Sequence, residues 1–113
     1  MSWQAGSVVA VSRRNGIAWD SVVSCEMIGI YRPHALACQA AACWLNLPPR
    51  SILMVACHNI DLNAAQDAGM RTAFVRWPDA WGPAGPPDPI PNKADDCIGD
   101  GFQGLHDRVL ATL

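Results

Sequence analysis

The chain has 113 residues, of which 50% are hydrophobic and 16% are charged, with a formal net charge of −2. This length and composition suit one globular domain, and the absence of a basic run argues against nucleic acid as a partner. No apolar stretch approaches the ~20 residues of a membrane span, and no signal-peptide pattern is present, so we expect no membrane association. Five cysteines without CxxC spacing indicate reduced thiols and a cytoplasmic location.

The first third of the chain predicts two helices and one short strand. Residues 3–15 have a weak helical pattern that ends at Gly16. Residues 22–24 (Val-Val-Ser) are rich in β-branched side chains and predict a strand. Pro33 then opens a helix that runs from about His34 to Leu45, because proline is favoured in a first turn.

The face of this second helix is small and apolar, which suits packing on a sheet. The residues assigned to it are Ala35, Leu36, Cys38, Gln39, Ala42, Cys43 and Leu45. Cys38 and Cys43 are interpreted as core thiols rather than as metal ligands.

The centre of the chain predicts a β–α–β unit. Ile52 to Ala56 is an uninterrupted apolar run, typical of a strand covered on both faces. A helical pattern follows from Leu62 to Ala68, and Thr72 to Val75 is the second strand. Asp61 follows the first strand, where ligands bind in open α/β sheets. The same position equally suits an ordinary helix N-cap.

The last third predicts a loop, a strand and a helix. Residues 77–91 are rich in proline and predict a long surface loop. Residues 95–98 predict a brief last strand, and residues 102–113 a terminal helix. This order of elements predicts an α/β fold with a largely parallel sheet. A flavodoxin-like binding domain is a weaker interpretation, because no glycine-rich phosphate loop follows any predicted strand.

From Gly16 onward the sequence resembles the carboxyl-terminal half of the haloacid dehalogenase (HAD) superfamily, and within it the 2-haloacid dehalogenases. The stretches that carry the resemblance are residues 19–24 (WDSVVS), 31–33 (YRP), 48–75 and the proline-rich loop. The resemblance implies a truncated Rossmann-like, HAD-type three-layer sandwich with a mostly parallel sheet. Residues 1–113 would form a single partial HAD-like core domain that lacks the first two core strands and the cap.

The family's chemistry implies the candidate site residues. In the family, an aspartate on the first strand attacks the substrate and forms an ester, which water then hydrolyses. By resemblance Arg32 takes the place of the basic residue, which is usually a lysine, and its planar fork is not equivalent to an ammonium. Asp61 matches the carboxylate of the last motif, and His58 and Asn59 match the polar residues before it. We expect Arg32 and Asp61 to face each other, with His58 nearby.

Cys57 helps to distinguish between the two branches of the family that the chain could resemble. It falls where the phosphatase branch carries a magnesium-binding aspartate, and a neutral thiol is a poor ligand for a hard cation. The resemblance therefore favours the metal-free dehalogenase branch, with no metal and no cofactor. The implied ligand is a small halogenated acid or anion.

The family's nucleophile motif has no counterpart here. No DxD sequence precedes Gly16, and Asp20 is the first acidic residue. One hypothesis is a HAD-like hydrolase fragment, related to the 2-haloacid dehalogenases, that is inactive alone because no nucleophile is present. The alternative is a non-catalytic remnant that acts through self-association or a partner, with Arg32 and Asp61 as an inherited structural pair.

Under both hypotheses, the predicted strand Ile52 to Ala56 lacks a neighbouring strand on one side. In the family the nucleophile strand lies beside the equivalent strand, so its absence leaves an unpaired edge. Such an apolar edge favours association, and this run contains no charge or proline to prevent it. We therefore expect a homodimer through this edge.

Overall fold

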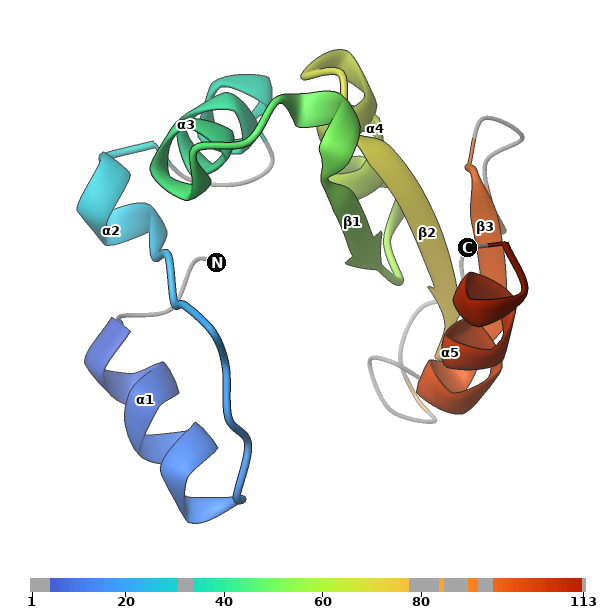
Figure 1. The fold of residues 1–113 in the computed structure, drawn as a ribbon, viewed down its shortest axis with the longest axis horizontal. Coiled ribbons are helices and arrows are strands. Elements are labelled where there is room, and N and C mark those ends of the chain that lie inside the picture. Colours follow the sequence, from blue (N-terminus) through green and yellow to red (C-terminus); the bar gives the residue numbers. More distant parts are fainter. Residues whose placement is uncertain (1–4, 31–33, 78–83, 85–89, 92–94, 113) are drawn as a thin grey trace.

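The computed structural model describes residues 5–30, 34–77, 84, 90–91 and 95–112 (Figure 1). The helices in this part of the chain are α1 (Ala5–Arg14), α2 (Cys25–Ile28), α3 (Ala35–Leu45), α4 (Asn59–Asp67) and α5 (Gly101–Thr112), with a short 3-10 helix at Pro49–Ser51. The strands are β1 (Leu53–Ala56), β2 (Arg71–Arg76) and β3 (Cys97–Asp100). No described helix is long and apolar enough to cross a membrane.

The three strands form one parallel sheet in the order β1-β2-β3, as the α/β pattern predicts. β2 is the central strand, and its four inner residues, Thr72 to Val75, are buried. β1 lies at the edge of the sheet, and within the described residues no strand pairs with its outer side. Its side chains alternate between exposed and half-buried, with Leu53 37% and Val55 39% exposed.

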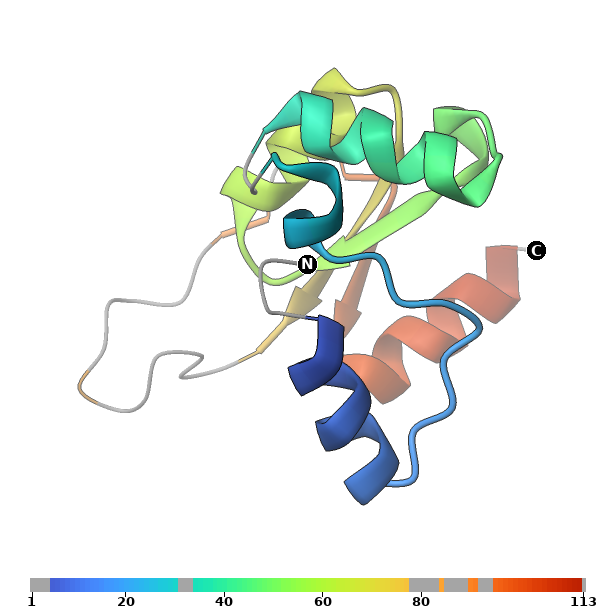
Figure 2. The same cartoon turned by 90° about the vertical axis from the view of Figure 1, so that its left-hand side faces the viewer.

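Helices cover the sheet on both faces, which gives the expected three layers (Figures 1 and 2). On one face, α3 and α4 form a core with the turn before β2 and with Met54 of β1; its buried residues are Cys38, Ala42, Ala65, Ala68 and Met70. On the other face, Leu105 of α5 packs against Ala73 and Val75. Val55 pairs in register with Ala73 and so shares that second face. It stays exposed because α5 packs on β2 and β3 rather than over β1.

Gly99 allows α5 to lie close to the sheet. A Cβ atom added at Gly99 would lie 2.5 Å from the Cα of Leu105 and 2.6 Å from its backbone nitrogen. Any other residue would therefore force strand β3 and helix α5 apart.

The amino-terminal helices lie apart from the sheet (Figure 1). The Trp19 indole donates a 2.7 Å hydrogen bond to the Ser12 hydroxyl, which ties the following connector back onto α1. The backbone N–H of Ala5 donates a 2.7 Å hydrogen bond to Glu26, which joins α1 to α2. Gly16 has a φ of 68° and ends the first helix, as the sequence predicts.

The predicted strand over residues 22–24 is wrong. Ser24 is the N-cap of α2, and its hydroxyl accepts the N–H of Glu26 at 3.3 Å. The β-branched preference of Val22 and Val23 has no effect without a neighbouring strand, because strand propensity depends on pairing and burial. A capping hydroxyl instead satisfies the local backbone in a helical turn.

The structure differs from the sequence predictions in three smaller respects. The last strand is Cys97–Asp100 rather than residues 95–98, because the side chains of Asp95 and Asp96 bond to Thr72 before the strand begins. Helix α4 begins at Asn59 rather than Leu62. The prediction that Cys43 is a core thiol is also wrong.

In α3, Cys38 is buried, but Cys43 and Leu36 are exposed. α3 packs against α4 and, less extensively, against α2, and its buried residues are Ala37, Cys38 and Ala42. The predicted face was therefore too wide.

Candidate functional site

The polar residues predicted for the site gather where β1 ends and α4 begins. His58 occupies the N-cap position of α4, without a capping hydrogen bond from its side chain. Asn59 is the first helical residue, and Asp61 lies in the first turn, half-buried. Asp61 is therefore not the N-cap. The positive end of the helix dipole nevertheless favours a carboxylate in that turn.

Asn59 connects α4 to the carboxyl end of the proline-rich segment. Its side-chain amide donates a 2.6 Å hydrogen bond to the backbone carbonyl of Ile90. Its Oδ1 atom is buried and has no hydrogen-bond partner among the residues that the structure describes. A buried acceptor without a donor costs free energy, so a donor from a ligand or a further polypeptide segment would stabilise this position.

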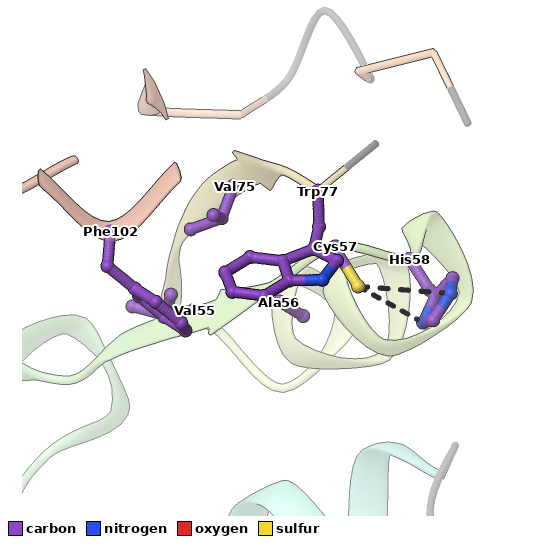
Figure 3. Close-up of a pocket in the computed structure, with 7 residues that line it drawn as sticks. All are labelled: Val55, Ala56, Cys57, His58, Val75, Trp77 and Phe102. Carbon is purple, nitrogen blue, oxygen red and sulfur yellow. Dashed lines mark hydrogen bonds between the residues drawn. The ribbon is translucent and has the colours of Figure 1, made fainter. Parts of the chain in front are cut away.

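Cys57 and His58 lie side by side in the lining of a cavity (Figure 3). The Cys57 sulfur is 3.6 Å from Nδ1 and 3.8 Å from Nε2 of the imidazole. Both side chains are half-buried. Both distances lie within the range of a hydrogen bond between a thiol and an imidazole.

The cavity has a volume of about 400 Å³ and mainly apolar walls. Its lining residues are Val55, Ala56, Cys57, His58, Val75, Trp77 and Phe102. The rings of Trp77 and Phe102 lie 5.3 Å apart at an interplanar angle of 58° and close one side (Figure 3). The cavity lies on the face of β1 that α5 leaves uncovered. Its size suits a small organic molecule.

Sequence reasoning missed two parts of this end of the sheet. Trp77 and Phe102 come from distant segments, and only the fold brings their rings together. Arg76 and Asp100 end β2 and β3 and form an ion pair with 3.1 Å between Nε and Oδ1. Both side chains are more than half exposed, so the pair contributes little stability. The available signal was an acidic residue close to the last strand, but the predicted strand ended at Ile98, two residues before Asp100.

The structure brings His58, Asn59 and Asp61 together within one turn of chain. Arg32 lies outside the described residues, so its pairing with Asp61 stays a prediction. The described residues contain no group of three or more histidine, cysteine, aspartate or glutamate side chains that could hold a metal ion.

Comparison with known proteins identifies solved structures that share this fold. No protein-family profile and no curated protein sequence matches the chain. The crystal structure of an L-2-haloacid dehalogenase is similar with a TM-score of 0.86 and 31% identity, over 92% of this chain and 46% of that chain. A defluorinating L-2-haloacid dehalogenase is similar with a TM-score of 0.86 and 28% identity, over 92% and 42%. The chain spans less than half the length of either structure. It therefore has the Rossmann-like fold of the haloacid dehalogenase superfamily, and its coverage is consistent with the carboxyl-terminal half of a 2-haloacid dehalogenase.

Proposed function

We propose that the chain is the carboxyl-terminal half of a HAD-like hydrolase core, with hydrolysis of a carbon–halogen bond as its reaction class. The observation that carries this proposal is the position of His58, Asn59 and Asp61 directly after β1. This position supports the proposal because the fold matches half of an L-2-haloacid dehalogenase at 31% identity. The substrate would be a small halogenated acid, and Arg32 would supply the positive charge.

The proposed mechanism divides the work between two polypeptide segments. An aspartate from a complementary segment would attack the carbon that bears the halogen, and the halide would leave with the bonding electrons. Water would then hydrolyse the resulting ester. This chain would contribute the electrostatic part, in which the Arg32 guanidinium offsets the charge of the nearby carboxylates and Asp61 completes the polar site. Because these 113 residues contain no DxD sequence, we expect no turnover by the chain alone.

Halide release from 2-chloropropionate tests this proposal. We expect the chain alone to release no chloride above background. Mixed with the amino-terminal polypeptide of a 2-haloacid dehalogenase, which carries the nucleophile strand, it should release chloride. Asp61→Asn should abolish this release, whereas Asp107→Asn, a change at an exposed position on α5, should not.

Two outcomes would contradict the proposal in different ways. Chloride release by the chain alone that disappears in Asp61→Asn would show that a nucleophile is already present. A mixture that forms a stable complex but releases no chloride would favour the non-catalytic alternative.

The uncovered edge of β1 favours that alternative, a self-associating domain. Leu53 and Val55 are exposed apolar side chains on a strand that has no described neighbour on its outer side. A second copy could cover them in a two-fold homodimer. A cytoplasmic location is part of both proposals, and the free state of all five cysteines supports it.

A further inference from the structure

We propose that Cys57 and His58 form a thiol site that captures a small, uncharged carbon electrophile with an apolar body. The site is the cavity between β1, Trp77 and Phe102 (Figure 3). The proposal does not depend on a complementary polypeptide or on carbon–halogen hydrolysis, because every group that it uses belongs to the described residues.

The backbone fixes the position of the thiol. Cys57 is the first residue after β1, and α4 begins two residues later, so the strand and the helix hold it from both sides. Its sulfur is 3.6 Å from Nδ1 of His58, within reach for the imidazole to accept the thiol proton. The thiolate is the reactive form of a cysteine side chain, so removal of this proton is the step that activates the sulfur.

The cavity walls define the class of ligand. Val55, Val75, Trp77 and Phe102 are all apolar, and together they form most of the lining. A charged ligand would lose its hydration there without a partner, whereas an aromatic or aliphatic body would be stabilised by burial. The reactive carbon would lie at the Cys57 end of the cavity.

The chemical step is one nucleophilic substitution at a carbon atom. His58 takes the proton from the thiol, and the sulfur attacks the electrophilic carbon. A carbon–sulfur bond forms while the bond to the leaving group breaks, and the leaving group departs with the electron pair. The product is a stable thioether, so the site reacts once and does not turn over.

The five cysteines of the chain supply internal controls. Cys43 is exposed, Cys57 and Cys97 are half-buried, and Cys25 and Cys38 are buried. Exposure alone predicts that Cys43 reacts fastest. The proposed site predicts instead that Cys57 reacts faster than Cys43 by about tenfold or more.

Competitive labelling with iodoacetamide and with N-benzyliodoacetamide, followed by peptide mass spectrometry, measures each rate in the full chain. The benzyl reagent should raise the ratio of the Cys57 rate to the Cys43 rate, because its ring fits the cavity. Phe102→Ala should reduce this increase. Cys25 and Cys38 should remain unlabelled, which reports that the chain is folded.

His58→Gln separates a reactive pair from a merely accessible thiol. It should slow labelling of Cys57 by about tenfold or more and leave Cys43 unchanged. The matched control is His106→Gln, which alters an exposed histidine on α5 and should leave both rates unchanged. The proposal is overturned if Cys57 reacts no faster than Cys43, if His58→Gln leaves the Cys57 rate unchanged, or if all five cysteines react at similar rates.

Discussion

At the scale of single residues, Gly99 sets the distance between β3 and α5. We predict that Gly99→Ala destabilises the fold by about 1–3 kcal/mol, the usual cost of inserting an atom into a well-packed contact. The clash would be with the backbone of Leu105, at 2.5 Å and 2.6 Å, so no side-chain rotation relieves it. Urea unfolding followed by circular dichroism gives the free energy of unfolding.

Gly104→Ala is the matched control for this change. A Cβ atom at Gly104 would make only ordinary contacts, the nearest at 3.6 Å to the Asp100 side chain. Because alanine is favoured over glycine inside a helix by about 0.5–1 kcal/mol, this variant should be slightly more stable than the unchanged chain. Equal stability of the two variants would show that the close approach is not rigid.

Residue-scale predictions from sequence succeeded where neighbours in sequence are neighbours in space. The position of His58, Asn59 and Asp61 after the first strand could be predicted because one short segment carries them all. The aromatic wall of the cavity could not be predicted, because Trp77 and Phe102 meet only after β2 and β3 have paired. No local pattern carries that information.

At the scale of elements, a hydrogen-bond network around Thr72 joins α4, β2 and the segment before β3. The buried Thr72 hydroxyl donates to Asp95 at 3.0 Å and accepts from Gln66 at 3.0 Å. The Thr72 N–H donates to Asp96 at 2.8 Å. These bonds hold the carboxyl-terminal end of α4 against the amino-terminal end of β2 and the segment that leads into β3.

We predict that Thr72→Val lowers the free energy of unfolding by about 1–3 kcal/mol, because Asp95 and Gln66 each lose a partner at a buried position. Thr72→Ser keeps the hydroxyl and loses one methyl group, so it should cost less. Thermal unfolding of the two variants compares them directly. A valine variant as stable as the serine variant would mean that the network does not stabilise the fold.

The same network explains why element boundaries were harder to predict than the elements. β1, α4, β2 and α5 follow clear apolar patterns, and the sequence located each of them. The start of β3 depends on side-chain bonds from Asp95 and Asp96 to a distant strand. The false strand at residues 22–24 has the opposite cause, a local pattern without a pairing partner.

At the scale of the whole molecule, the uncovered edge of β1 predicts association. We expect a homodimer that buries more than about 1,000 Å², detectable by sedimentation at micromolar concentration. Val55→Lys should shift it to the monomer, because a charged side chain on an edge strand opposes pairing. Leu110→Lys, which changes an exposed apolar residue on α5, should leave the dimer intact. A monomeric unchanged chain would rule out this assembly.

The parallel sheet also keeps two kinds of residue apart. The Thr72 network lies near the start of β2, while the polar turn that begins at Cys57 follows β1 three positions past Met54, the residue that pairs with Thr72, a distance of roughly 10 Å along the strands. Substitutions this far apart usually have additive effects. Residues 57–61 are therefore open to randomisation in a laboratory evolution experiment, because new side chains there leave the bonds around Thr72 untouched. The scaffold could acquire a new ligand preference with little loss of foldability.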